Sequence, residues 1–221
     1  LEEISDGKLY DVNDMVKADC RDCEGCFDCC CEMGESILLD PYDVYRLEKG
    51  LGVSFEKLLE QNLELHVVDG VILPNLKMGG KEERCTFLNE AGRCSIHPFR
   101  PGICRLFPLG RYYEDGAFRY FLQTAECRKQ NRSKIRVKKW IDTPDYKRNE
   151  AFILTWHYFI RTLQERLTAQ PDMEAAKRIN LQVLEIFFFR EWEDGEDFYD
   201  QFEKRMEAAR SALHLSDGEK G

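Results

Sequence analysis

The sequence predicts an α+β protein in which a cysteine-rich part with short hairpins and helices precedes a C-terminal segment of three helices. Three observations support this fold class. Two Asp-Gly pairs stand between β-prone segments, all ten cysteines precede residue 128, and the last third of the chain has a helical repeat of apolar residues. We therefore expect a cysteine-rich domain over residues 1–140 and a helical segment over residues 141–221.

Two short helices are expected after the first cysteines, whereas the polar residues 1–19 predict only a short arm or helix. Asp40 is a suitable N-cap and Pro41 suits the first turn, so a helix is predicted over residues 41–49. Ser54 can cap a second short helix. The inner face of the first helix is marked by apolar residues at helical spacing, namely Val44, Leu47 and Leu51.

Each Asp-Gly pair predicts the two-residue turn of a β-hairpin. In the first hairpin, residues 65–68 lead to Asp69-Gly70. In the second, residues 111–113 lead to Asp115-Gly116, and residues 118–122 form the returning strand.

The pattern changes after Pro144 to three amphipathic helices, because apolar residues recur every three or four positions. Their predicted inner faces consist of Phe152, Trp156, Phe159, Leu163 and Leu167; Met173, Ala176, Ile179, Val183 and Phe187; and Phe198, Phe202, Met206, Ala209 and Leu213.

Composition and charge limit the possible partners. The 32 Lys and Arg against 41 Asp and Glu give a net charge of -9, which argues against general binding to nucleic acids or anionic membranes. No stretch approaches the roughly 20 apolar residues of a membrane span. We expect a cytoplasmic protein whose thiols stay reduced and available to metals, with a protein or small molecule as partner.

One segment departs from this overall charge. Residues 128–140 carry seven basic residues, which would suit a nucleic-acid contact. Because the whole chain is acidic, we interpret the segment instead as a solvated connector. It is expected to face acidic residues of the C-terminal part, namely Glu191, Glu193, Asp194, Glu196 and Asp197.

The first cysteine group has a repeated three-residue step. It reads Cys20-Arg-Asp-Cys23-Glu-Gly-Cys26-Phe-Asp-Cys29-Cys30-Cys31. Such steps let the thiolates of a tight loop converge on a metal, and this repeat is closer to ferredoxin-type iron-sulfur spacing than to a zinc ribbon. Adjacent cysteines point to different sides of an extended chain, so two centres or one polynuclear centre are expected unless the chain turns sharply.

Four further cysteines follow at wider spacing, namely Cys85, Cys94, Cys104 and Cys127. The sequence Asn89-Glu-Ala-Gly92 predicts a turn that brings Cys85 and Cys94 together. Neighbouring arginines can donate hydrogen bonds to thiolates and offset their negative charge, and these are Arg93, Arg100 and Arg105.

Together these motifs resemble the YkgJ-like CxxCxxCC family. The residues that carry the resemblance are Cys23-x2-Cys26-x2-Cys29-Cys30, Leu39-Asp-Pro-Tyr-Asp-Val44, Cys85-Thr-Phe-Leu88 and Arg93-Cys-Ser-Ile-His97-Pro-Phe-Arg100-Pro-Gly-Ile-Cys104-Arg-Leu-Phe-Pro108. They span roughly residues 15–130. The resemblance implies a zinc- or iron-chelating domain in which Cys23, Cys26, Cys29 and Cys30 bind metal. Cys85, Cys94, Cys104 and Cys127 are implied as the second set.

This chain departs from the family pattern at four positions. Phe27 stands where the family usually has glycine, and His97 where it often has an aromatic residue, so we interpret His97 as a packed or surface residue rather than a ligand. Cys20 and Cys31 are additional cysteines. Cys20 continues the three-residue step and is counted as a ligand, whereas Cys31 interrupts the step and is interpreted as a bystander.

We therefore predict a metal-binding protein that holds an iron-sulfur cluster of the 4Fe-4S type and has a redox or cluster-dependent role. Two alternatives are a zinc-stabilised interaction module and an enzyme that uses the cluster to modify a protein. No acid, base or nucleophile can be assigned, so catalytic residues and enzyme status stay open. The predicted ligands are Cys20, Cys23, Cys26, Cys29, Cys30, Cys85, Cys94, Cys104 and Cys127.

Overall fold

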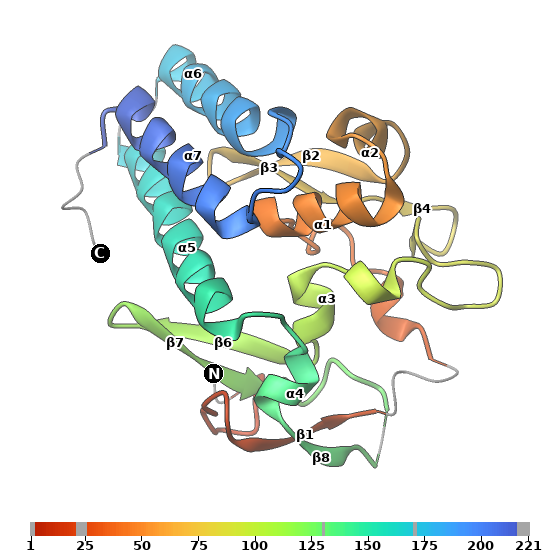
Figure 1. The fold of residues 1–221 in the computed structure, drawn as a ribbon. Coiled ribbons are helices and arrows are strands. Elements are labelled where there is room, and N and C mark those ends of the chain that lie inside the picture. The colour runs from red at the N-terminus through yellow and green to blue at the C-terminus, as the bar shows by residue number, and fades with distance from the viewer. Residues whose placement is uncertain (1–2, 21–25, 130, 170–171, 216–221) are drawn as a thin grey trace. The chain divides into compact units, whose positions relative to one another are not determined.

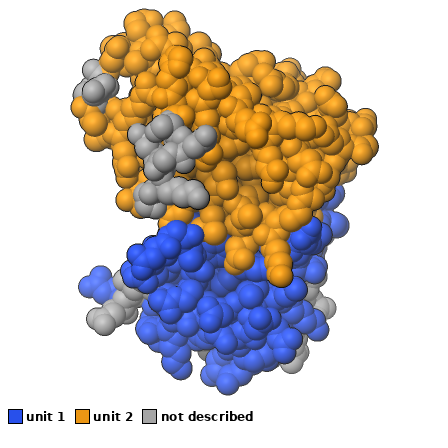
Figure 2. All heavy atoms as spheres, turned by 60° about the vertical axis from the view of Figure 1, so that its left-hand side comes forward, with its two compact units in different colours: residues 1–37, 77–146 blue, residues 38–76, 147–221 orange. Residues whose placement is uncertain are grey.

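The computed structural model describes residues 3–20, 26–129, 131–169 and 172–215 (Figure 1). The predicted α+β class is confirmed, because helices and small antiparallel strand pairs alternate along the chain. Contacts divide the chain into two compact units, coloured separately in Figure 2. Unit 1 contains residues 1–37 and 77–146, and unit 2 contains residues 38–76 and 147–221. The expected division into a cysteine-rich domain over residues 1–140 and a helical segment over residues 141–221 stays a prediction.

Unit 1 is built from three antiparallel strand pairs and short helices. The strand pairs are β1 (Met15–Asp19) with β8 (Ser133–Arg136), β4 (Met78–Gly79) with β5 (Arg84–Cys85), and β6 (Leu109–Glu114) with β7 (Ala117–Leu122). The helices are η1 (Asp28–Cys30), η2 (His97–Phe99), α3 (Gly102–Leu106) and α4 (Val137–Ile141).

The core of unit 1 explains why the predicted arm or helix before the first cysteine ends in a strand. Val16 and Ala18 are buried, and their two-residue spacing is that of a strand with one buried face. They pack in one cluster with Leu106, Leu109, Tyr120, Leu122, Val137 and Ile141. The Trp140 indole N–H donates to the backbone oxygens of Leu106 and Phe107. This cluster fixes the ends of the segments that carry the cysteines.

Unit 2 combines two short helices, one hairpin and the C-terminal helices. Its elements are α1 (Pro41–Leu51), α2 (Phe55–Gln61), β2 (Leu63–Val68), β3 (Val71–Leu76), α5 (Tyr146–Ala169), α6 (Met173–Leu184), the π-helical turn η3 (Glu185–Phe189) and α7 (Phe198–Leu213). Asp40 forms a capping box with Asp43 at the start of α1, and Ser54 caps α2, as predicted. Leu51 is an error of prediction, since it is 40% exposed.

Both predicted hairpins are confirmed. Asp69 and Gly70 have φ values of 49° and 86°, and Asp115 and Gly116 have 50° and 73°. Positive φ at both central residues is the type I′ geometry that matches the twist of the flanking strands. The registers Val68↔Val71 and Glu114↔Ala117 therefore follow directly from the two Asp-Gly pairs.

The three predicted C-terminal helices form and bury most of their predicted inner faces. Aromatic rings dominate this core, with the centroids of Phe152 and Phe202 4.6 Å apart and those of Trp156 and Phe187 5.0 Å apart. Met173 is an exception at 88% exposure. It is the first residue of α6, and the packed face of this helix begins later in the chain. In the described residues, no helix is long and apolar enough to cross a membrane.

A side-chain amide ties the hairpin of unit 2 to α6. Asn180 is buried, accepts a 2.7 Å hydrogen bond from the Ile72 N–H and donates a 3.0 Å bond to the Gly70 carbonyl. The amide thus satisfies backbone groups at the edge of β3. This contact helps to explain why residues 63–76 fold with helices that lie about a hundred residues later in the sequence.

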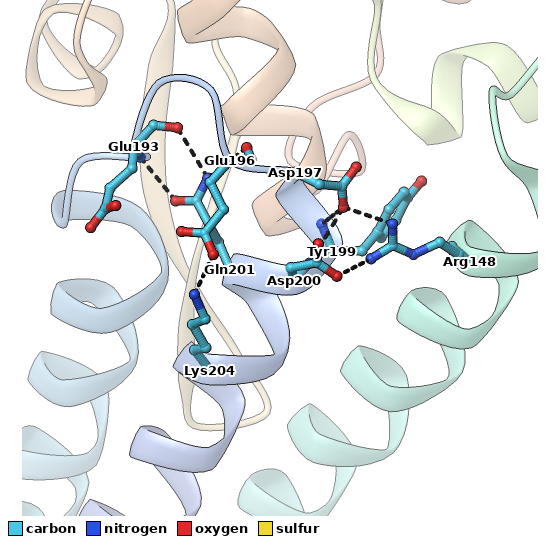
Figure 3. A network of polar contacts seen from close by, with 8 residues as sticks. All are labelled: Arg148, Glu193, Glu196, Asp197, Tyr199, Asp200, Gln201 and Lys204. Atoms are coloured by element: carbon cyan, nitrogen blue, oxygen red, sulfur yellow. Dashed lines mark hydrogen bonds and ion pairs between the residues drawn. The ribbon is translucent and has the colours of Figure 1, made fainter.

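The acidic residues before α7 have partners inside unit 2 (Figure 3). Arg148 contacts Asp197 at 3.0 Å and Asp200 at 2.5 Å, while Glu196 pairs with Lys204. Asp194 likewise pairs with Lys49. Three of the five acids expected to face the basic segment 128–140 therefore have cations within their own unit, and their contact with that segment stays a prediction.

Glu48 on α1 is a half-buried carboxyl group. Its pKa is raised from 4.5 to about 7, chiefly by burial and also by the negative charge of Glu56. A hydrogen bond from the Phe55 N–H, followed by Lys49 and Arg205, acts in the opposite direction. Because the folded state holds this proton more tightly than the unfolded chain, the stability it contributes is fully present below pH 4.5 and is lost as the pH rises through about 7.

Replacing Glu48 by Gln should remove this pH dependence. We expect the free energy of unfolding at about pH 8 to rise by about 1 kcal/mol, after allowance for partial exposure to solvent. Urea unfolding of Glu48→Gln and parent at about pH 5 and about pH 8 measures the effect. Glu207→Gln on α7 is the control, because that side chain is exposed and is not among the groups that shift the pKa of Glu48. A parent-like pH dependence in Glu48→Gln would contradict the assignment.

Candidate metal centre

Nine of the ten cysteines lie in the described part of the chain, all in unit 1 and all as free thiols. The tenth, Cys23, lies outside the described residues. Cys85 is buried, and the other eight described cysteines are half-buried. Free thiols distributed over several loops are the donor set that zinc and iron-sulfur centres use.

The first cysteine loop, residues 26–31, contains the sharp turn that adjacent cysteines need to come together. The Cys30 N–H donates to the Phe27 carbonyl at 2.8 Å, and the Cys31 N–H donates to the Asp28 carbonyl at 3.2 Å. This turn is η1, and within it the thiols of Cys29 and Cys30 form a hydrogen bond. With this turn, Cys29 and Cys30 do not require separate metal centres.

The second cysteine loop, residues 85–94, folds back on itself as predicted. The Gly92 N–H donates to the Asn89 carbonyl at 2.9 Å, and the Leu88 N–H donates to the Cys85 carbonyl at 2.9 Å. Leu88 and Cys94 form an isolated antiparallel bridge. The turn brings Cys94 within electrostatic range of the Cys85 thiol, where a negative charge on either sulfur opposes a charge on the other.

The two loops meet through their backbones. Cys31 pairs with Arg84 in an isolated antiparallel bridge, and the Glu32 N–H donates to the Glu83 carbonyl at 2.9 Å. Cys31 thereby stands beside the residue that precedes Cys85. Spacing alone makes Cys31 a bystander, whereas the fold places it next to the second loop.

The thiols of both loops make one another harder to ionise. Burial raises the pKa of Cys85, and the thiols of Cys94, Cys31 and Cys29 raise it further. The pKa of Cys29 is raised first by its hydrogen bond with Cys30 and then by burial. The thiols of Cys29 and Cys31 in the first loop thus act on Cys85 in the second, and a metal cation would relieve this opposition.

Two of the three predicted arginines act in the opposite direction. Burial is the largest influence on Cys94 and raises its pKa, while Arg100 and Arg93 lower it. Arg100 also lowers the pKa of Cys29. Arg100 donates a hydrogen bond to Nε2 of His97, so that this nitrogen is already engaged. We retain the interpretation of His97 as a residue outside the ligand set.

The remaining described cysteines lie on neighbouring elements. Cys26 donates to the Asp28 carboxylate at 3.5 Å, and burial raises its pKa whereas Lys129 lowers it. Arg128 lies 4.0 Å from Glu32, so the segment that carries Cys127 lies beside the first cysteine loop. Cys104 lies on α3, and Cys20 follows the end of β1.

The described thiols are close without converging on a single point. In the described ranges, no group of three Cys, His, Asp or Glu side chains is placed to hold one metal ion. Cys29 and Cys31 of the first loop nevertheless lie within electrostatic range of Cys85 in the second. The donor chemistry fits zinc or iron, and the loops would have to close further for four sulfurs to bind one ion.

The sequence model of the CxxCxxCC family, described as "Putative zinc- or iron-chelating domain", matches residues 22–140. This stretch covers more than half of the chain and includes Cys31 and all four downstream cysteines, whereas Cys20 precedes it. The resemblance seen in the motifs is thereby confirmed. No curated protein and no solved structure matches the chain.

Arg100→Gln should raise the pKa of both Cys29 and Cys94, because it removes the cation that favours their thiolates. Alkylation of these two thiols by iodoacetamide should then require higher pH, since the thiolate is the nucleophile. The pH profile of alkylation at each cysteine, read by mass spectrometry, measures the change. Arg100→Lys should restore part of the parent profile, and Arg119→Gln on β7 is the control. Unchanged profiles in Arg100→Gln would contradict the assignment.

Proposed function

Because this chain belongs to the CxxCxxCC family, we propose that unit 1 binds an iron-sulfur cluster of the 4Fe-4S type through thiols from both cysteine loops. The observation that carries the proposal is the junction of the two loops, where Cys31 pairs with Arg84 and the nearby sulfurs of Cys94, Cys31 and Cys29 raise the pKa of the Cys85 thiol. Thiols that share one electrostatic environment are the ligands that a cluster of several iron atoms needs.

The spread of the thiols favours a cluster over a single ion. A polynuclear cluster presents its iron atoms at separate corners, so its ligands stand farther apart than the ligands of one ion. This suits described thiols that interact without converging on one point. Zinc is the second candidate, because Cys29, Cys31, Cys85 and Cys94 would supply the four thiols of a tetrahedral structural site if the loops closed further.

A bound cluster would supply one-electron redox chemistry. The chain's own contribution is electrostatic, since Arg93 and Arg100 favour negative charge on the sulfurs. We propose a redox role with an electron-exchanging protein or small molecule as partner, in a reducing compartment such as the cytoplasm. The nine described free thiols are consistent with that location. A cluster-dependent enzyme that modifies a protein or small substrate is the third candidate.

Elemental analysis and visible absorbance of anaerobically purified protein test the metal. We expect iron with sulfide and a coloured protein, whereas zinc with no colour would establish the second candidate. Cys26→Ser, Cys85→Ser and Cys94→Ser should each lower the bound metal. Ser95→Ala is the control, because it removes the hydroxyl that contacts the Phe87 carbonyl and leaves every sulfur in place. Parent-like metal content in all three cysteine variants would disprove chelation.

The variant Cys31→Ser tests whether the motif spacing or the contacts in the fold identify the metal ligands. The three-residue step leaves Cys31 outside the ligand set, but its position beside Arg84 and its effect on Cys85 support a ligand role. We expect Cys31→Ser to lose metal as Cys85→Ser does. If Cys31→Ser keeps its metal, Cys31 is a bystander and the step in the sequence defines the ligands.

Removing the metal should loosen unit 1 far more than unit 2. The cysteine loops have few large apolar side chains of their own, whereas unit 2 has an extensive aromatic core. After anaerobic chelation, amide hydrogen exchange should accelerate over residues 77–104 and stay slow in α5 and α7. Equal acceleration in both units, or none in the cysteine loops, would show that metal binding and local structure are not coupled in this way.

A further inference from the structure

Phe27 packs directly onto the second cysteine loop. A Cβ atom at Gly92 would stand 2.9 Å from Cδ1 of the Phe27 ring, closer than carbon atoms approach without a clash. Gly92 therefore provides the space that the ring occupies. The guanidinium carbon of Arg84 lies 5.1 Å from the ring centroid, within the range of a cation-π contact.

This contact joins the loops at a second place, apart from their backbone junction. The backbone junction lies at Cys31 and Arg84, with the Glu32 N–H bonded to the Glu83 carbonyl nearby. The ring contact lies at the other end of the first cysteine loop, next to Cys26. Cys29 and Cys30 thus lie between two points that are both attached to the 83–92 region.

We infer that Phe27 is a positioning residue of the metal centre, which holds the first cysteine loop against the second so that one centre takes thiols from both. This inference rests on the proposed metal binding and adds that the centre is shared between the loops. The contact uses carbon and guanidinium groups only, so it leaves every thiol available. Gly92 is needed twice, for the space beside the ring and for its φ of +70°.

The role of Gly92 can be separated from backbone strain by a matched pair of variants. Gly92→Ala adds a methyl group against Phe27 and strains a residue at φ +70°. Gly116→Ala strains a residue at φ +73°, has nothing within 4 Å of the new methyl group and lies in the β6–β7 turn. Both proteins should lose comparable stability from strain, but only Gly92→Ala should push the loops apart.

The probe is Co²⁺, titrated anaerobically into the reduced metal-free protein and followed by its thiolate charge-transfer absorbance. We expect Gly92→Ala and Phe27→Ala each to weaken Co²⁺ binding by about tenfold or more, the usual effect of losing a residue that supports ligands. Gly116→Ala should bind as the parent does. Phe27→Tyr should also bind as the parent does, because it keeps the ring and adds a hydroxyl at a partly exposed site.

A double-mutant cycle and an NMR measurement keep the test independent of general misfolding. In the Phe27→Ala background, Gly92→Ala should weaken Co²⁺ binding much less than in the parent, because the clash is gone. In the metal-free protein, the Gly92 α-protons should show a ring-current shift that disappears in Phe27→Ala, while signals of the β1–β8 pair persist.

The outcomes separate this inference from the proposed function. If the parent binds Co²⁺ and both Gly92→Ala and Phe27→Ala bind it equally well, metal binding stands and the positioning role is wrong. If the effects of the two substitutions simply add, the ring and Gly92 do not act on each other and the inference also fails. A parent protein that binds no Co²⁺ and carries neither iron nor zinc after anaerobic purification would contradict the proposed function itself.

Discussion

The constraint on which unit 1 depends is the crowding of thiols that oppose one another's ionisation. Cys85 and Cys94 are hard to ionise chiefly because they are buried, and neighbouring sulfurs add to this. Arg93 and Arg100 supply positive charge that favours the Cys94 thiolate. Two guanidinium groups cannot balance five thiolates, so a metal is the natural source of the missing charge. Its binding would release thiol protons and draw the loops together.

The rest of unit 1 holds the two cysteine loops close together. The apolar cluster around Val16, Leu109 and Val137 fixes the ends of the cysteine-bearing segments, but contributes little within the loops themselves. Inside the loops, short turns and backbone bridges replace a core. This division places stability in the cluster and adaptability in the loops, as expected where a metal completes the structure.

Sequence reasoning succeeded where the physical cause is local. Asp-Gly turns fix hairpin register through the backbone angles of two residues, and the capping box at Asp40 requires only Asp43. It failed where the cause is distant in the chain. Nothing near residue 72 indicates that Asn180 will satisfy its N–H, and nothing near Met173 shows that the packed face of α6 begins later. Such contacts depend on the assembled unit.

The same distinction between local and distant causes applies to the candidate site. The turn that brings Cys85 and Cys94 together could be predicted from Asn89 and Gly92, because turn residues act locally. The second role of Gly92, which is to leave space for the Phe27 ring, could not be predicted from the sequence, since that ring lies more than sixty positions earlier in the chain. A large side chain at position 27 requires space on the opposite loop, and glycine at position 92 supplies it. Sequence spacing identifies the sulfurs, but the proposal that one centre takes thiols from both loops rests on contacts between the loops.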